Sequence, residues 1–572
     1  MDGTSRMFAP FADKECTKSV SISDAILAFM PFDKLTEIVK NNASVINNKE
    51  LHGHTSLHKA ALRGDPKITE LLIQNGANIH ATNDYGETAF HFSCKQGSVV
   101  NLYALLKSGA DATFRDTMGR SGMHHAACGG SVVAMHYLAT VLDIPYDDVD
   151  FGGVTPLHLA SSQGFQDAIK YLLRKERSDA RFKDSNGNIA LHYACTTGLT
   201  ETVWTLVEFG GCGTLTEANS NGQTPMNILS EGKTRSHAYI RSQMESLTDA
   251  KDPRKPPSGP LLSWFVMLLV PAVSLVNIVF TGYLFRGYSG LVVTILTVIL
   301  FSYIIKQNHR LPHMSRWSNP VYAGAFGAGI FHTGVVYMYK VLPVLWPLYP
   351  MLVIISFSLA AVMLYMYIRL LTNDPGACQT SRNSNSHLEE YTTVDHIAKG
   401  QCDIIDFCVT CEIIPPERVK HCKICQKCFY DHDHHCLFLL TCIARNNHRS
   451  FIFFLLLTSL LHALFSAQAG IYLILSHLGG DMAWMQFFSI IFFKEGWLNM
   501  LIAGNILSIF WELTVVSAQF LVISRGLTAT YRPSGWNSKY KMTTRDQVNN
   551  ICYFLKGKRT YTARDLYHTN VV

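Results

Sequence analysis

The chain has 572 residues, enough for about four domains of ordinary size. Only 16% of the residues are charged, against roughly 25% in a typical soluble domain, while 48% are hydrophobic and the mean hydropathy is positive at +0.12. This composition argues against a single compact soluble fold, and the net charge of +6 is too small for this length to indicate a nucleic-acid partner.

The first part of the chain is repetitive. The first thirty residues show no basic stretch followed by an apolar core, so we expect no cleavable signal there. We assign residues 1–22 to a disordered N-terminus. The tetrapeptides TSLH, TAFH, SGMH, TPLH, IALH and TPMN then begin at residues 55, 88, 121, 155, 189 and 224. A glycine lies nine residues after each of the first five starts, and apolar residues flank it at helical spacing, which predicts two short helices per unit.

This repeat resembles the ankyrin repeat, whose period is about 33 residues and whose T-P-L-H opens the first helix. We assign residues 23–250 to an ankyrin-repeat domain in which residues 23–48 form an N-terminal cap. Because solenoids present an extended concave surface, we expect this domain to recruit protein partners. A passive spacer is the alternative. Residues 251–260 follow as a Pro-rich, basic linker.

Six apolar segments predict membrane spans, because each is long enough to cross about 30 Å of hydrocarbon as a helix. They are Leu262–Phe285, Tyr288–Ile305, Val321–Tyr339, Pro350–Ile368, Phe451–Leu475 and Trp497–Ile523. We therefore place spans 1–4 within residues 261–373, spans 5–6 within 451–525 and a cytosolic tail at 526–572. The segment Met482–Phe493 is too short to span. Span 6 carries Glu512, whose role the sequence leaves open.

Basic residues predict the orientation. Lysine and arginine are dense before span 1, between spans 2 and 3, and between spans 4 and 5, so these sides face the cytosol together with both termini. Nine of the 15 cysteines lie between Cys378 and Cys442, interleaved with histidines. Such crowding is typical of metal binding in a reducing compartment, which agrees with a cytosolic position.

The cysteine-rich segment, residues 374–450, has the spacing of zinc ligands. From Cys408 onward, with Cys436 set aside, six thiolates and the imidazoles of His421 and His435 have this spacing: Cys408, Cys411, His421, Cys422, Cys425, Cys428, His435 and Cys442. Tetrahedral zinc sites take four ligands, so the count predicts two structural zinc ions. The spacing does not decide how the eight ligands are shared between them.

One thiol is left over for chemistry. Asp433, His434, His435 and Cys436 are consecutive, and an aspartate that orients a histidine beside a cysteine is an arrangement of nucleophilic acyl chemistry. The block resembles the DHHC cysteine-rich domain of protein S-acyltransferases, and ankyrin repeats before six spans resemble the ankyrin-bearing branch of that family. The resemblance implies an all-α protein: an ankyrin solenoid, then a six-span bundle with a cytosolic two-zinc domain inserted between spans 4 and 5.

The resemblance also implies residue roles. One zinc would take Cys408, Cys411, His421 and Cys428, and the other Cys422, Cys425, His435 and Cys442. Cys436 would accept a long-chain acyl group from palmitoyl-CoA and pass it to cytosolic cysteines of protein substrates, with Asp433 and His434 activating the thiol. Residues Arg418, Lys420, Lys423 and Lys427 form a basic face suited to CoA phosphates, or else to anionic lipid headgroups. We expect a multi-pass protein of an endomembrane, the Golgi.

Some positions depart from the family's pattern. The expected T-T-x-E is Thr528-Ala529-Thr530-Tyr531, and the Pro-Trp after the reactive cysteine is Leu437-Phe438. These departures keep open a weakly active enzyme or an inactive ankyrin and zinc adaptor. A six-span ankyrin cation channel is a further alternative, but a block with eight zinc ligands between spans 4 and 5 does not suit it.

Overall fold

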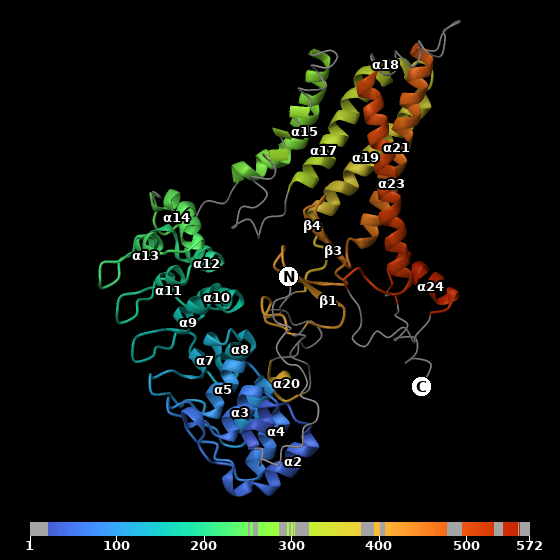
Figure 1. Ribbon diagram of the computed structural model, residues 1–572. Helices are drawn as coiled ribbons and strands as arrows, with labels where there is room; N and C mark the ends of the chain where they lie inside the picture. The colour runs from blue at the N-terminus through green and yellow to red at the C-terminus, as the bar shows by residue number, and fades with distance from the viewer. Residues whose placement is uncertain are drawn as a thin grey trace. The chain divides into compact units, whose positions relative to one another are not determined.

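The computed structural model describes residues 21–249, 252–255, 261–284, 320–378, 394–400, 407–413, 415–477, 495–530 and 542–558, with the isolated residues 295–296, 299–300, 302–303 and 560. Figure 1 shows a mainly helical chain. It divides into two compact units: residues 1–257 with 392–409, and residues 258–391 with 410–572. Most of the predicted second span and the segment Met482–Phe493 lie outside the described residues.

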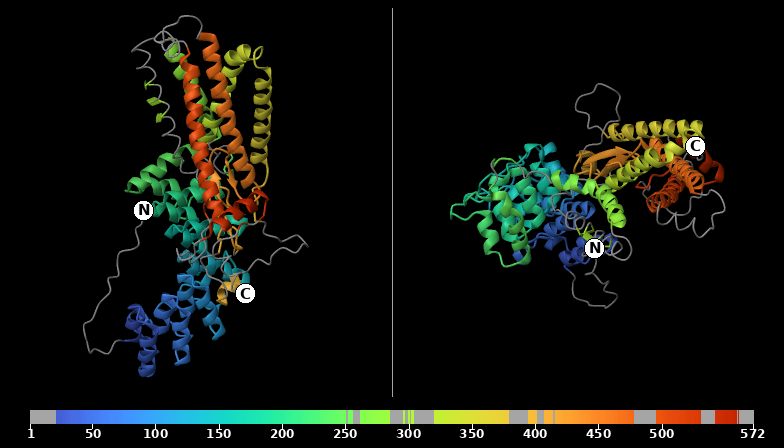
Figure 2. Two further views of the ribbon diagram at one scale, coloured as in Figure 1. Left: turned by 90° about the vertical axis from the view of Figure 1, so that its right-hand side faces the viewer. Right: turned by 90° about the horizontal axis from the view of Figure 1, so that it is seen from above.

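Unit 1 is a stack of helix pairs. The cap helices are α1 (Ile22–Leu27) and α2 (Phe32–Asn41). The first helices of the repeats are α3 (Ser56–Arg63), α5 (Ala89–Gln96), α7 (Gly122–Cys128), α9 (Pro156–Gln163), α11 (Ala190–Thr197) and α13 (Pro225–Glu231). The second helices are α4 (Pro66–Gln74), α6 (Val99–Lys107), α8 (Val132–Val141), α10 (Gln166–Leu173), α12 (Thr200–Gly210) and α14 (Arg235–Thr248). Consecutive first helices pack against one another, which buries the apolar faces that one repeat cannot bury alone (Figure 2).

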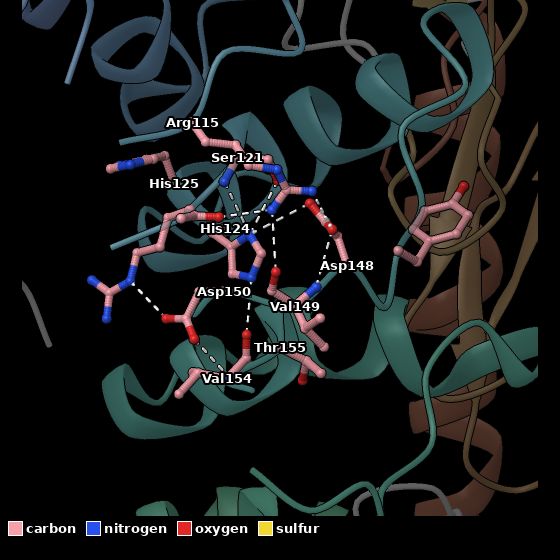
Figure 3. A network of polar contacts seen from close by, with 12 residues as sticks. Arg115, Ser121, His124, His125, Asp148, Val149, Asp150, Val154 and Thr155 are labelled. Atoms are coloured by element: carbon pink, nitrogen blue, oxygen red, sulfur yellow. Dashed lines mark hydrogen bonds and ion pairs between the residues drawn. The ribbon is translucent and has the colours of Figure 1, made fainter. Parts of the chain in front are cut away.

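The motif histidine explains why the tetrapeptide recurs. In the third unit, the Nδ1 atom of His124 accepts the Ser121 backbone N–H at 3.2 Å, which caps helix α7. The Nε2 atom lies 3.0 Å from the Val154 carbonyl oxygen, in the next repeat (Figure 3). His58, His158 and His192 make the same pair of contacts, and His91 makes the same cap while its Nε2 atom lies 3.0 Å from the Phe114 carbonyl oxygen. Each of these histidines therefore ties its helix start to the following repeat.

These histidines predict that unit 1 loses stability in mild acid. Burial lowers the pKa of His58 to about 4 and that of His91 to about 3, whereas in the unfolded chain both titrate near 6.5. Below pH 6.5 each of these histidines is protonated in the unfolded state but neutral in the folded state. Each therefore lowers the free energy of unfolding by about 1.4 kcal/mol per pH unit until its folded pKa is reached. Hydrogen-exchange protection of α3 and α5, corrected for the intrinsic rate, should fall steadily between pH 6.5 and pH 5. Constant protection over this range would contradict the prediction.

One segment between span 4 and the cysteine-rich domain belongs to unit 1. Helix α20 (Val394–Ala398) buries Val394, Ile397 and Ala398 and packs against α6 and α8 of the repeats. The ring of Phe407 lies 5.4 Å from that of His136, in α8. The predicted domain 374–450 stays a prediction, and within it helix α20 groups with the repeats because its apolar residues pack against α6 and α8.

Unit 2 contains four helices long and apolar enough to span a membrane within the described residues. The first, Val321–Leu345, consists of α17 (Val321–Val336), a π-helical turn η6 (Tyr337–Val341) and α18 (Leu342–Leu345). The others are α19 (Pro350–Thr372), α21 (His448–His477) and α23 (Gly496–Ser524). They correspond to the predicted spans 3, 4, 5 and 6. Helix α15 (Leu261–Leu284), at the predicted span 1, packs against α17.

The described residues 407–413 and 415–447 of the cysteine-rich domain contain no helix. They contain two antiparallel hairpins, β1 (Val419–Cys422) with β2 (Lys427–Tyr430), and β3 (His434–Cys436) with β4 (Thr441–Ile443). The expectation of an all-α fold is therefore wrong here, because the ligand-rich runs are too short for helices and pair as ribbons instead. After α23, helix α24 (Thr544–Leu555) packs back onto that span.

Candidate functional site

The strand register brings the predicted metal ligands together. In the first hairpin His421 pairs with Cys428, and in the second His435 pairs with Cys442. Directly paired residues of an antiparallel ribbon point to the same face, while neighbours along a strand point to opposite faces. His421 and Cys422 are therefore directed to different groups although they are adjacent in sequence.

Two groups of four ligands result. The first is Cys408, Cys411, His421 and Cys428, and the second is Cys422, Cys425, His435 and Cys442. This is the grouping that the family resemblance implies. Within each group the ligand atoms lie within 4.8 Å of one another.

The distances suit zinc. Tetrahedral coordination, with bonds of about 2.3 Å to sulfur and about 2.0–2.1 Å to nitrogen, places neighbouring ligand atoms about 3.6–3.8 Å apart. The Nδ1 atom of His435 lies 3.3 Å, 3.8 Å and 3.6 Å from the sulfurs of Cys425, Cys422 and Cys442. The Nδ1 atom of His421 lies 3.4 Å from Cys411 and 3.8 Å from Cys428. Both donor sets fit zinc ions held by thiolates and imidazole Nδ1.

The same alternation separates metal binding from chemistry in strand β3. His435 points to the metal group, so His434 and Cys436 share the opposite face of the strand. Cys436 is buried, with 5% of its surface exposed, and packs in an apolar cluster that includes Leu439 and Phe451. A single three-residue strand thus carries a candidate metal ligand on one side and His434 and Cys436, the predicted reactive pair, on the other.

Asp433 holds His434 in place. The carboxylate oxygen Oδ2 of Asp433 lies 2.7 Å from the Nδ1 atom of His434. Burial raises the pKa of Asp433, but the hydrogen bonds from His434 and the Ala529 amide outweigh it and lower the pKa to about 2. Burial also disfavours a charge on His434, yet Asp433 and the nearby Cys436 sulfur raise the pKa of His434 to about 9. The raised pKa favours the protonated, cationic form of the His434 ring.

The structure adds residues that sequence reasoning missed. Gln519, in α23, donates from Nε2 to Oδ2 of Asp433 at 2.7 Å, and its Oε1 atom lies 2.8 Å from Nε2 of buried His448, in α21. The backbone N–H of Ala529 donates to Oδ1 of Asp433 at 2.7 Å, and the Thr528 hydroxyl donates to the His432 carbonyl at 2.8 Å. The departure at Ala529 therefore keeps a donor to Asp433, because the donor is a backbone amide.

Gln519 is expected to act as a positioning residue. Gln519→Met keeps the side chain's bulk but removes the donor to Asp433, and a hydrogen bond to a charged group contributes about 1.5–3 kcal/mol. Acyl loading of Cys436 should slow by roughly 10- to 150-fold at saturating donor, with little change in the donor concentration for half-maximal rate. The matched control is Ser517→Ala, since the Ser517 hydroxyl bonds only its own helix, at the Leu513 carbonyl. Equal rates in Gln519→Met and wild type would overturn this role.

An apolar cavity of about 270 Å³ lies beside the reactive cysteine. Its lining includes Cys436, Leu437 and Phe438 from the cysteine-rich domain, and Trp511 and Val515 from α23. The ring of Phe438 lies 5.0 Å from that of Trp511. The departure at Leu437-Phe438 therefore changes the wall of this cavity.

Three of the four residues of the predicted basic face are exposed, and one is buried. Lys420, Lys423 and Lys427 are exposed on the first hairpin. Arg418 is buried instead, with its Nε atom 2.6 Å from Asp431 and its guanidinium donating to the Thr560 carbonyl at 2.9 Å. The prediction that Arg418 meets CoA phosphates is therefore not supported, because its charge is already paired inside the domain.

Comparisons with known proteins agree with this geometry. Residues 401–536 match the DHHC palmitoyltransferase family, and residues 57–102 and 99–178 match ankyrin-repeat families. The chain is 34% identical over 139 residues to palmitoyltransferase akr1 of Aspergillus oryzae, which is 24% of this chain and 18% of that protein. It is 29% identical over 259 residues to palmitoyltransferase akr1 of Emericella nidulans, which is 41% of this chain and 33% of that protein.

A plant relative is also similar, the probable protein S-acyltransferase 12 of Arabidopsis thaliana, with 27% identity over 22% of this chain and 48% of that protein. The chain thus spans less than half the length of each of these relatives. Among solved structures, the human ASB11 ankyrin repeat domain covers 40% of the chain, with 99% of its own length matched, at 21% identity and a TM-score of 0.33.

The described residues thus combine helical repeats, four helices long and apolar enough to span a membrane, and two hairpins that carry zinc-type ligand groups beside Asp433, His434 and Cys436. The matched families make the similarity specific: the chain is similar to ankyrin-repeat proteins over residues 57–178 and to the DHHC palmitoyltransferase family over residues 401–536.

Proposed function

We propose that the chain is a protein S-acyltransferase. The observation that carries this proposal is the Asp433–His434 ion pair on the same face of β3 as Cys436, next to an apolar cavity. The Cys436 thiolate attacks the thioester carbonyl of a long-chain acyl-CoA such as palmitoyl-CoA. The bond to the CoA sulfur breaks, His434 donates its proton to the departing thiolate, and the acyl group remains on Cys436.

The second step returns the enzyme to its starting state. His434, now neutral, takes the proton of a cysteine thiol on a protein substrate. That thiolate attacks the acyl-Cys436 thioester, the acyl group moves to the substrate, and Cys436 leaves as a thiolate beside the imidazolium again. Asp433 keeps the ring oriented with Nδ1 toward itself throughout.

Other groups supply binding and support. Two structural zinc ions on the eight ligands would stabilise the hairpins. The exposed Lys420, Lys423 and Lys427 suit the phosphates of CoA, and the apolar cavity suits the acyl chain, at about 0.8 kcal/mol per buried CH₂. The ankyrin repeats would dock protein substrates that carry cytosolic cysteines. We further propose six spans, with both termini and the cysteine-rich domain in the cytosol, in an endomembrane such as the Golgi.

Acyl loading tests the proposal. Purified protein is incubated with alkyne-tagged palmitoyl-CoA, and wild type is compared with Cys436→Ser. We expect label that neutral hydroxylamine releases and that the variant lacks, which together establish a thioester on Cys436. Wild-type protein that holds two zinc ions but takes no label would overturn the proposed acyltransferase activity and favour the inactive ankyrin and zinc adaptor.

A further inference from the structure

Five polar side chains form a connected cluster inside the apolar bundle. The Ser459 hydroxyl, in α21, donates to Oε2 of Glu512, in α23, at 2.7 Å. The other carboxylate oxygen, Oε1, lies 3.4 Å from Nε2 of His462. The Nδ1 atom of His462 hydrogen-bonds Oδ1 of Asn505, and Asn505 in turn donates to the Thr333 hydroxyl, in α17, at 3.3 Å.

Burying these polar groups inside the apolar bundle costs free energy. Glu512 is 3% exposed and Asn505 5% exposed, within helices whose length and hydropathy suit a membrane. Ionisable groups at such depth are expensive and are kept where they serve a function. The bundle would pack with apolar residues at these positions.

The cluster separates two cavities. Glu512 lines the cavity that contains Cys436. Thr333, His462 and Asn505 line a second apolar cavity of about 200 Å³, further along the same helices. The two ends of one hydrogen-bonded network thus belong to the walls of two different cavities.

The rise of helix α21 gives the distance between the level of Cys436 and the polar cluster. The ring of Phe451 lies 5.5 Å from that of His434, so Phe451 marks the level of the reactive site on α21. Ser459 is eight residues further, a rise of about 12 Å along the helix. An extended carbon chain with bonds of about 1.5 Å advances roughly 1.25 Å per carbon. A chain of about ten carbons therefore reaches from the level of Phe451 to that of Ser459.

We infer that Ser459, His462, Asn505 and Glu512 form a polar partition that limits the length of the acyl group on Cys436, so that medium-chain acyl-CoAs of about ten to twelve carbons load better than palmitoyl-CoA. This inference rests on the proposed function. A chain that ends at the partition leaves its hydrogen bonds intact. A longer chain must break them to enter the second cavity, and it then lays methylene groups against an unpaired carboxylate.

A chain-length series tests the inference. Wild-type protein is incubated with an equimolar mixture of saturated acyl-CoAs from octanoyl to stearoyl, and the mass of the acyl group on Cys436 is read by intact-protein mass spectrometry. We expect dodecanoyl to exceed palmitoyl by about tenfold or more, since single methylenes at the end of a closed pocket change selectivity on that scale.

Substitutions in the cluster then test which residues cause the preference for medium chains. Glu512→Ala removes the carboxylate and should shift the preferred chain to palmitoyl or longer, and Ser459→Ala should shift it in the same direction if Glu512→Ala does not fold. Ser508→Ala, on the same helix as Glu512 and bonded only to the Gly504 carbonyl, should leave the wild-type profile unchanged.

Two results would overturn the partition: a wild-type preference for palmitoyl, or the same medium-chain profile in Glu512→Ala and wild type. The absence of a thioester with every acyl-CoA would instead refute the proposed function, so the two failures are distinguishable.

Discussion

Replacing His435 with alanine is expected to lower the zinc content from two ions to one and to reduce acyl loading of Cys436 to background. Strands β3 and β4 have only three residues each, so the hairpin buries little apolar surface of its own. The metal must therefore supply much of its folding free energy, and apparent binding free energies of structural zinc are about 10–16 kcal/mol. Without it, His434 and Cys436 lose the strand that holds them together.

The measurement is metal content by plasma mass spectrometry, paired with acyl loading on the same sample. His396→Ala is the matched control, because His396 is exposed on α20 and belongs to neither ligand group. It should keep two zinc ions and normal loading. If His435→Ala retained both ions, the assignment of this histidine as a ligand would be wrong.

Asp433→Asn should slow acyl loading by roughly 10²–10⁴-fold, the range in which general acid and base groups contribute. The carboxylate of Asp433 accepts hydrogen bonds from His434, Gln519 and the Ala529 amide. An asparagine has one acceptor oxygen and presents an N–H group on the other side, so at least one donor is left unsatisfied. The pKa of His434 should also fall, because Asp433 contributes to raising it.

Zinc content separates this effect from unfolding. Asp433 is in neither ligand group, so the variant should still hold two ions while loading slowly. Asp395→Asn, which removes the ion pair between Asp395 in α20 and Lys399 just after it, serves as the control and should load at the wild-type rate. Fast loading by Asp433→Asn would show that the ring needs no carboxylate.

Spacing alone was enough to predict what lies close together along the chain. The repeat starts predicted the helix pairs, and the cysteine and histidine spacing predicted eight ligands. The division of these ligands into two groups depends on strand register, which places His421 opposite Cys428 and His435 opposite Cys442. The spacing left this open because the hairpins are short and were not expected as strands.

Contacts between distant segments had no signal in the sequence. Gln519 and Ala529 lie 86 and 96 residues from Asp433, and both reach it only because span 6 ends beside the hairpins. Arg418 was misassigned for the same reason, since Thr560 is 142 residues away. Glu512 was noticed as a charge within a span, but its partners Ser459 and His462 became apparent only once α21 and α23 were packed together.

The division of faces on strand β3 constrains how this gene can change. A one-residue insertion or deletion within the strand inverts every following side chain, so that His435 would exchange places with its reactive neighbours. Metal binding and thiol chemistry would then be lost in one event. Point substitutions, by contrast, alter one function at a time. Lineages of this protein should therefore rarely vary in length between residues 433 and 436.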